Sequence, residues 1–289
     1  MYKRQEVDPK CAEAYSGLGR IYYDMGDYIK AGKMYEKAIE LKPSLAEAHF
    51  GLGLVYSKQD NLEKSISEFR RVIELEPNYT LAYSNLALRY VSEGDIPKAM
   101  ESCRRALSID PNFAHAYFVL GLIYMKDGRF EDAERSFKEA LRLEPGDKHS
   151  LFNLGLTYMK MHRDRDAMEQ FRKVLEMDPE YAEAHYNLGV LLIRSGDREG
   201  GRKELKRFRE LSEYAREREN LEYVLYVSPT PMTEAQEARA HYRLGLVHAK
   251  WGKYEKALEE FERAVRIDSS LASAYFKACL LYTSPSPRD

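Results

Sequence analysis

Proline recurs at a fixed interval along most of this chain. Six prolines follow one another at intervals of 34 residues: Pro9, Pro43, Pro77, Pro111, Pro145 and Pro179. A fixed period of this length is typical of repeat architectures, in which each unit is a small supersecondary motif that buries its apolar face against its neighbours. The chain is therefore expected to form an open row of repeats. Its 289 residues do not translate into a count of ordinary domains.

The unit from Ala114 to Asp147 illustrates how one period would fold. Its first half places four residues at the i, i+3, i+4 and i+7 spacing of one helix face: Tyr117, Leu120, Gly121 and Tyr124. Asp127-Gly128-Arg129 interrupts the pattern, a second apolar helix face follows over 130–141, and Pro145-Gly146 ends it. Two helices of about a dozen residues are marginal alone in water, so each hairpin must pack against the next one.

Superposing the units shows which positions recur. One slot is always leucine: Leu18, Leu52, Leu86, Leu120, Leu154, Leu188 and Leu244. The next slot is small: Gly19, Gly53, Ala87, Gly121, Gly155, Gly189 and Gly245. In the second helix the recurrent apolar or aromatic residue is Tyr35, Phe69, Cys103, Phe137, Phe171 or Phe261, preceded by a small residue four positions earlier. The small slot predicts the point where the second helix crosses the first.

These joint offsets resemble the tetratricopeptide repeat from about Ala12 to Leu271. The resemblance implies an all-α fold, a right-handed superhelical solenoid of antiparallel helix pairs whose first helices line the concave surface. We count seven repeats, and they begin at Ala12, Ala46, Thr80, Ala114, Lys148, Ala182 and Ala238. Residues 12–197 would hold the first five repeats and the first helix of the sixth, and residues 238–271 the seventh. Residues 6–11 look like the tail of a preceding repeat and 272–278 like the start of an eighth.

Residues 198–237 interrupt the period. The sixth and seventh repeats start 22 residues further apart than the period requires. A helical stripe runs on to about Tyr226, the Ser228-Pro229-Thr230-Pro231 stretch stops it, and Thr233 with Gln236 predicts a capping box for the next helix. One interpretation is a lengthened hairpin that changes the superhelix. The other is a docking arm or an oligomer contact.

The two ends do not fit the repeat. Residues 1–5 and 279–289 can be written with codons that encode each other in reverse complement, as a transposase sequencing adapter translated at both edges of a read would. We therefore expect both ranges to be adapter-derived, and the chain to be an internal fragment of a longer protein from a prokaryotic metagenome.

Composition excludes several function classes. The net charge of −2 argues against nucleic-acid binding, which requires a dominant basic surface. No apolar run approaches the roughly 20 residues that span a bilayer, so no membrane insertion is expected and the composition suits the cytoplasm and the periplasm equally. Cys11, Cys103 and Cys279 lack metal-ligand spacing. The oligomeric state is left open.

No catalytic or cofactor-binding sequence motif is present, so the sequence predicts neither an enzyme nor a bound cofactor or metal. The GxxxxGK[ST], HExxH, GxSxG and GxGxxG patterns are all missing. His162-Arg163-Asp164 resembles part of a kinase catalytic loop but falls in a predicted turn. The histidines follow repeat slots: His49, His185 and His241 are interpreted as packing residues. His115 and His149 could face one another, without a third metal ligand.

Positions of the first helices that the resemblance places on the concave surface predict a binding groove. An apolar strip would be formed by Phe50, Phe118, Phe152, Tyr186, Leu122, Leu156, Met125 and Met159. Contiguous exposed apolar surface marks binding sites. The alternative is that these side chains cover one another between adjacent helices.

Two polar rows would flank the strip. Asn85, Asn153 and Asn187 share the sixth helix position, where an asparagine can grip a peptide backbone because its amide both donates and accepts hydrogen bonds. Otherwise they are ordinary surface residues. Lys126, Lys160 and Arg194 share the thirteenth position with Lys58 and Lys250. Complementing the helix dipole explains this second row, and an acidic stripe on a partner is the alternative.

The leading hypothesis is a non-enzymatic scaffold that holds an extended or helical peptide segment of a partner protein in the concave groove. A second hypothesis is the substrate-presenting arm of a larger enzyme, such as a glycosyltransferase, whose catalytic domain lies outside this sequence. A third is a subunit of a secretion or pilus assembly.

Overall fold

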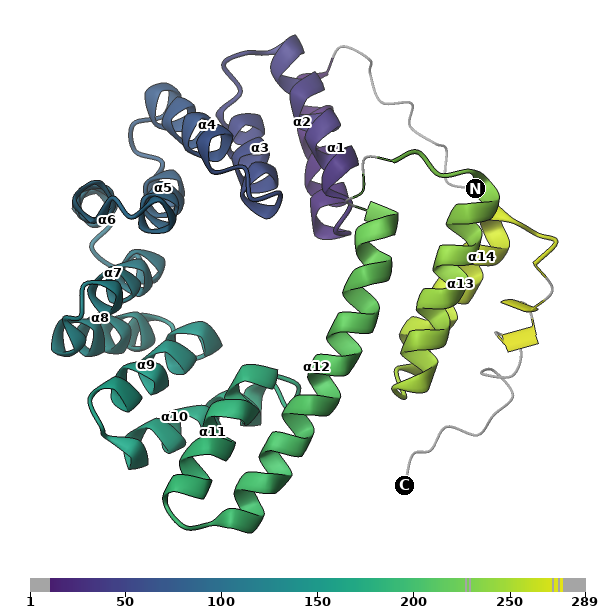
Figure 1. The fold of residues 1–289 in the computed structure, drawn as a ribbon. Coiled ribbons are helices and arrows are strands. Elements are labelled where there is room, and N and C mark those ends of the chain that lie inside the picture. Colours follow the sequence, from purple (N-terminus) through teal and green to yellow (C-terminus); the bar gives the residue numbers. More distant parts are fainter. Residues whose placement is uncertain (1–10, 227, 229, 272, 275, 278–289) are drawn as a thin grey trace. The chain divides into compact units, whose positions relative to one another are not determined.

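The computed structural model describes residues 11–226, 228, 230–271, 273–274 and 276–277. Within this part of the chain the fold is all-α, without a strand, and its fourteen helices form antiparallel pairs as predicted (Figure 1). The helices are α1 (Ala12–Asp24), α2 (Tyr28–Leu41), α3 (Ala46–Lys58), α4 (Leu62–Leu75), α5 (Thr80–Glu93), α6 (Ile96–Ile109), α7 (Ala114–Lys126), α8 (Phe130–Leu143), α9 (Lys148–Lys160), α10 (Asp164–Met177), α11 (Ala182–Arg194), α12 (Arg198–Tyr226), α13 (Glu234–Lys250) and α14 (Tyr254–Ile267).

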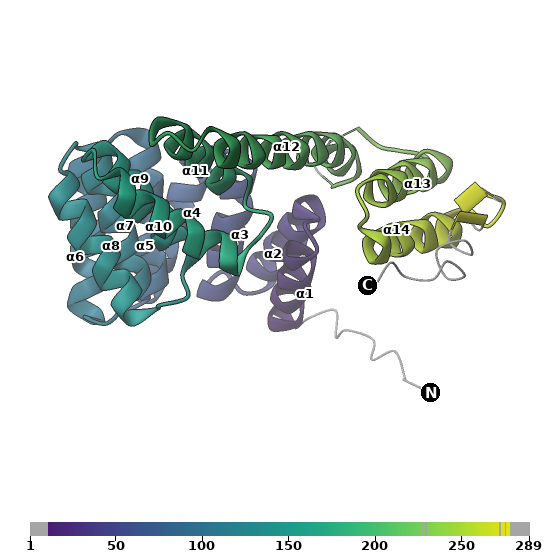
Figure 2. The same ribbon diagram turned by 90° about the horizontal axis from the view of Figure 1, so that it is seen from below.

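The chain divides into two compact units, Met1–Lys206 and Arg207–Asp289. In unit 1 the hairpins from α1–α2 to α9–α10 follow one another in a row (Figures 1 and 2). The first helix of each hairpin lies toward the inside of the arc of unit 1 (Figure 1). The ranges 1–5 and 279–289, for which the sequence predicts an adapter origin, lie outside the described residues. Of the expected tail of a preceding repeat only residue 11 is described, and of the expected start of an eighth repeat residues 273–274 and 276–277 are described and helical.

Short turns close the hairpins. After α7, Gly128 adopts a φ of 75°, in the left-handed region that glycine enters without steric cost. The Arg129 amide then donates to the Tyr124 carbonyl at 2.9 Å, and α8 begins at the next residue. In other hairpins an N-cap side chain starts the second helix: Asp27 accepts from the Lys30 amide and Asp95 from the Lys98 amide. The turn thus fixes the antiparallel pairing.

The glycine slot is the place where an aromatic ring of the second helix meets the first helix. A Cβ added at Gly155 would lie 2.7 Å from the Phe171 ring, and one at Gly121 would lie 2.4 Å from the Phe137 ring. Both rings are fully buried. The third repeat has a different pair of residues at these two positions. Ala87 stands at the small position and Cys103 at the aromatic position, and neither has any exposed surface. The repeat that has the methyl group of Ala87 in place of glycine is thus the one in which Cys103 replaces the aromatic ring.

Histidines at the fourth position of the repeat are buried, but packing is only part of their role. His49, His185 and His241 each place Nδ1 within hydrogen-bonding distance of a carboxylate 19 residues later: Glu68 at 2.6 Å, Glu204 at 2.5 Å and Glu260 at 2.6 Å. His49 and His185 also reach the carbonyl of the preceding loop proline with Nε2, at 3.0 Å in both cases. The interpretation as packing residues therefore missed a histidine–carboxylate hydrogen bond across the hairpin.

The pH dependence of stability should report on His49. Its hydrogen bond to Glu68 raises the pKa of His49 above the ordinary value of 6.5, against opposing effects of burial and of Arg71. A raised folded-state pKa contributes stability that is complete below the unfolded pKa and is lost as the pH rises through the folded pKa. We expect the stability advantage of the wild type over His49→Gln to shrink between about pH 6 and about pH 9.

Thermal melts of both proteins across this range measure the effect. Burial lowers the pKa values of His115 and His248, so these two residues change the stability with pH in the opposite direction. Both are present in the wild type and in the variant, and their contributions therefore cancel in the stability difference between the two proteins. A stability advantage of the wild type over His49→Gln that grows with pH would contradict a charged pair between His49 and Glu68.

The interrupted period is occupied by one continuous helix. α12 covers Arg198–Tyr226, and Thr233 and Gln236 form the predicted capping box at the start of α13. In unit 2 the second half of α12 has its own packing role, because Leu211, Tyr214 and Leu221 are buried. The Tyr214 hydroxyl lies 2.9 Å from His248 Nδ1. α13 begins at Glu234, four residues before the predicted start of the seventh repeat.

Candidate functional site

The predicted apolar strip lies on the first helices of unit 1, where its phenylalanines are shared between core and surface. The rings of Phe118 and Phe152 lie 6.0 and 5.6 Å from the buried rings of Phe137 and Phe171. Phe50 has the same contact with Phe69 at 5.6 Å. All three are partly buried. Their truncation would therefore disturb packing as well as any binding surface.

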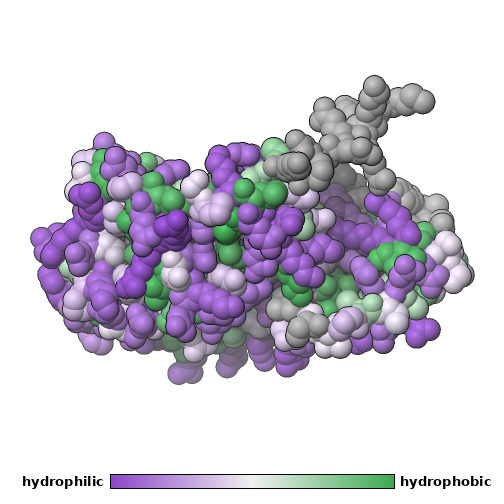
Figure 3. All heavy atoms as spheres, turned by 90° about the horizontal axis from the view of Figure 1, so that it is seen from above, coloured by the Kyte–Doolittle hydropathy of each residue, from purple (hydrophilic) through white to green (hydrophobic). Residues whose placement is uncertain are grey.

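The smaller members of the strip follow the same arrangement. Leu122, Leu156, Met125 and Met159 are partly buried and pack on the core cluster around Phe137 and Phe171. On α11 the apolar side chains are more accessible, since Tyr186 is 46% and Ile193 41% exposed. On the face of the molecule drawn in Figure 3, hydrophilic residues predominate and apolar residues form separate small groups. Among the residues of the predicted strip, Tyr186 on α11 is therefore the exposed one, while the others are partly buried.

The three predicted asparagines share one geometry. Each side-chain Nδ2 donates to the carbonyl four residues earlier in its own helix: Asn85 to Leu81 at 2.8 Å, Asn153 to His149 at 2.9 Å and Asn187 to Glu183 at 2.7 Å. This bond fixes the orientation of the amide and uses one of its two N–H groups. One N–H group and the Oδ1 acceptor remain for a ligand, since an amide has two donors and an acceptor oxygen.

Lys126 and Arg194 of the basic row contact the neighbouring hairpin. Lys126 Nζ donates to the Val91 carbonyl in the last turn of α5. One guanidinium nitrogen of Arg194 lies 3.2 and 3.1 Å from the two carboxylate oxygens of Asp164, the first residue of α10. The exposed Lys160 shows no ion pair within the described residues. A helix C-terminus carries a partial negative charge, so the positive charge of Lys126 is favourable both at the end of its own helix and at the end of α5.

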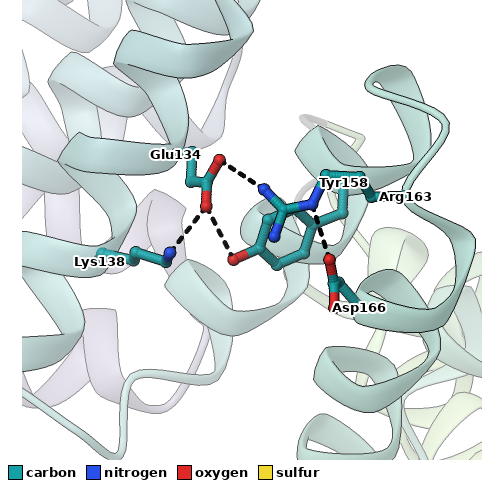
Figure 4. A network of polar contacts seen from close by, with 5 residues as sticks. All are labelled: Glu134, Lys138, Tyr158, Arg163 and Asp166. Atoms are coloured by element: carbon teal, nitrogen blue, oxygen red, sulfur yellow. Dashed lines mark hydrogen bonds and ion pairs between the residues drawn. The ribbon is translucent and has the colours of Figure 1, made fainter.

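Arg163 of the His162-Arg163-Asp164 motif belongs to a polar network between the fourth and fifth repeats. Glu134 on α8 accepts hydrogen bonds from Lys138, from the Tyr158 hydroxyl and from Arg163 at 2.7, 3.1 and 2.9 Å (Figure 4). Arg163 also binds Asp166 at 2.7 Å. Burial raises the pKa of Glu134, but the hydrogen bonds from Lys138 and Arg163 outweigh burial and leave the pKa lowered. Arg163 thus joins hairpins.

The two histidines that could have faced one another have separate partners. His115 Nδ1 lies 2.9 Å from the Ser84 hydroxyl, and the His149 ring packs 6.4 Å from the Tyr181 ring. The described residues include no group of three His, Cys, Asp or Glu side chains that could hold a metal ion. Among the described helices, none is sufficiently long and apolar to cross a bilayer.

Sequence reasoning missed two hollows on the second-helix side of unit 1. One of about 670 Å³ is bounded by α4, α5 and α6, and an adjoining one of about 810 Å³ lies over α4, the end of α5 and the start of α6. Arg70 and Glu74 line both. None of the predicted groove residues lines either hollow. The available signal was a repeated Arg-Arg pair, Arg70-Arg71 and Arg104-Arg105, at equivalent positions of adjacent repeats.

The paired helices, the glycine–aromatic contact and the 34-residue offset define a helical repeat protein of the tetratricopeptide class. Residues 2–224 match the family model of the C-terminal domain of cilia and flagella-associated protein 70, and residues 238–271 match the tetratricopeptide repeat model. Because the first match spans well over half of the chain, the chain belongs to this family of tetratricopeptide repeat domains. No curated protein sequence shows significant similarity to it.

Solved structures share the fold. TTC0263, a tetratricopeptide repeat protein of Thermus thermophilus, is 24% identical with a TM-score of 0.57 over 63% of this chain and 99% of that chain. PilW, a type IV pilus biogenesis factor, is 19% identical with a TM-score of 0.61 over 73% and 94%. A chain of the Cut9–Hcn1 hetero-tetramer is 15% identical with a TM-score of 0.56 over 94% and 50%. In general terms, this fold is that of a protein-interaction scaffold.

Proposed function

We propose that the first-helix face of unit 1 binds an extended peptide segment of a partner protein. The observation that carries this proposal is the common geometry of Asn85, Asn153 and Asn187, each fixed by a hydrogen bond to its own helix. A fixed amide that still has a donor and an acceptor loses little entropy when it binds a peptide N–H and carbonyl. Tyr186 and Ile193 supply accessible apolar contacts on α11.

The test removes Asn153 and Asn187 together. Peptides are first selected against the wild-type protein from a displayed random library, and their Kd values are measured by fluorescence polarisation. We expect Asn153→Ala with Asn187→Ala to weaken binding about 30-fold or more, because the two residues would lose four neutral hydrogen bonds worth at least about 0.5 kcal/mol each and 1.4 kcal/mol is tenfold. Alanine is the better helix former, so helicity should be retained.

The matched control is Asn78→Ala with Asn112→Ala, which changes two exposed loop asparagines. It should leave the Kd unchanged. Equal affinity of the wild type and the Asn153/Asn187 variant would reject backbone recognition by this row. Phe118 and Phe152 are unsuitable for the same test, since their rings pack on the buried rings of Phe137 and Phe171.

A further inference from the structure

The hollow between α4, α5 and α6 combines fixed positive charge with an apolar wall. Arg70 on α4 and the Arg104-Arg105 pair on α6 line it, together with Ile73 and Leu86. Leu86 is only 5% exposed and Ile73 is partly buried, so the apolar part belongs to the packed interface of three helices. A ligand side chain that enters a volume of about 670 Å³ would meet a preformed surface.

Charge distinguishes this part of the solenoid from the equivalent part of its neighbours. The two positions are Arg-Arg in the second and third repeats, but Glu36-Lys37 in the first and Lys138-Glu139 in the fourth. Within the described residues, the exposed Arg104 and Arg105 form no ion pair through their side chains. The three arginines that line the hollow face two carboxylates in its lining, Glu74 and Glu101, and Glu74 is already bound by Arg71 at 2.9 Å. The hollow therefore carries a positive excess.

One guanidinium is held in place. Arg70 donates to the Tyr90 hydroxyl from Nε at 3.0 Å and from a terminal nitrogen at 2.7 Å. Its guanidinium carbon also lies 5.8 Å from the centre of the Tyr90 ring, in cation–π contact. A neutral hydroxyl leaves the arginine charge uncompensated. The remaining edge of the Arg70 guanidinium and the exposed guanidinium groups of Arg104 and Arg105 can bind a carboxylate through two parallel hydrogen bonds, and the apolar wall beside them suits an acidic ligand that also carries an apolar side chain.

We propose that this hollow binds an acidic segment of a partner protein, whose carboxylates pair with Arg104, Arg105 and Arg70 and whose apolar side chain lies against Ile73 and Leu86. The site is separate from the first-helix face, because none of its lining residues is among the residues proposed there. It would give the scaffold a second contact, chosen by charge as well as by shape. Complementary charge raises the association rate and excludes basic partners.

Fluorescein-labelled peptides with alternating glutamate and leucine are suitable probes for the full chain. We expect the wild type to bind this peptide in a salt-dependent manner and to bind the matching glutamine–leucine peptide at least about tenfold more weakly. A peptide with alternating glutamate and serine should also bind more weakly, since it lacks the apolar side chain. Failure of the glutamate–leucine peptide to bind, or equal binding of the glutamine or serine peptide, overturns the proposal.

Charge reversal tests the assigned residues. Arg104→Glu with Arg105→Glu should weaken binding of the glutamate–leucine peptide at least about tenfold. The matched control is Arg172→Glu with Lys173→Glu, which makes the same charge change at the equivalent positions two repeats later. It should change the Kd less than about threefold. Equal losses in the two variants would show attraction by net charge alone and overturn the site.

Two further proteins keep the result unambiguous. Arg104→Lys with Arg105→Lys preserves the charge but cannot form two parallel hydrogen bonds to one carboxylate. Its affinity for the glutamate–leucine peptide should therefore fall between those of the wild type and the glutamate variant. Asn153→Ala with Asn187→Ala should bind the acidic peptide as the wild type does. A loss there, without a loss in the Arg104/Arg105 variant, would place the peptide on the first-helix face and reject this proposal. A single-stranded oligonucleotide that binds more tightly than the peptide would also reject it.

Discussion

Gly155→Ala is expected to destabilise the fifth repeat when made alone and to cost much less when Phe171 is cysteine. An added Cβ at position 155 would lie 2.7 Å from the Phe171 ring, which is fully buried. Overpacking of this kind costs about 1–3 kcal/mol, partly offset by the roughly 1 kcal/mol that alanine gains over glycine in a helix. With Phe171→Cys the ring is gone, so only the helical gain remains.

The reason for choosing cysteine is that the chain already uses this combination. Ala87 and Cys103 fill the same two slots in the third repeat, and both are completely buried. Phe171→Cys alone should cost about 3 kcal/mol, because it leaves a cavity. We expect a favourable interaction energy of about 1–2 kcal/mol between the two changes in the double-mutant cycle.

Native-state hydrogen exchange of the α9 and α10 amides measures these differences locally, which suits a repeat array whose parts can open separately. Gly17→Ala is the control, since nothing lies within 4 Å of an added Cβ there. It should stabilise α1 by up to about 1 kcal/mol. Strict additivity of the two changes in the fifth repeat would show that the glycine–aromatic contact does not set the hairpin spacing.

This contact was predictable from the sequence because it is local to one hairpin and recurs with the period. The same holds for the helices: the turn at Asp127-Gly128-Arg129 was visible as an interruption of a 3.6-residue pattern, and α8 begins directly after it. Periodicity reports which residues share a helix face. It gives no information on how polar groups across the faces are connected.

The polar connections were accordingly the part that sequence reasoning missed. His49 has the position of a packing residue, and its partner Glu68 falls on the second helix, where carboxylates are common. Only the recurrence of the 19-residue spacing at His185 and His241 distinguishes it from coincidence. The orientation of Asn153 toward its own helix and the hollow beside Arg104 depend on side-chain geometry among several helices, which a linear pattern does not encode.

The fourth position of the repeat shows a second case in which two paired residues are replaced together within this chain. In the third and fourth repeats this position is tyrosine and the residue 19 positions later is serine, in the pairs Tyr83–Ser102 and Tyr117–Ser136, whereas the first repeat pairs Tyr15 with Met34. Both tyrosine hydroxyls donate to the loop proline carbonyl at 3.2 Å, the bond that His49 makes from Nε2. Tyrosine–serine and histidine–glutamate are therefore two ways to tie the loop to the hairpin.

We expect Glu68→Ser alone to destabilise the second repeat by about 1–3 kcal/mol, because buried Nδ1 of His49 loses its acceptor. Adding His49→Tyr should recover most of this loss, as the larger ring fills the space of the shortened side chain and its hydroxyl reaches the Pro43 carbonyl. Urea denaturation followed by circular dichroism, at about pH 6 and about pH 9, measures both changes. The double variant should also lose the contribution of His49 to the pH dependence. A double variant less stable than Glu68→Ser would contradict the exchange, since it would mean that the surroundings of His49 accept only the imidazole–carboxylate pair.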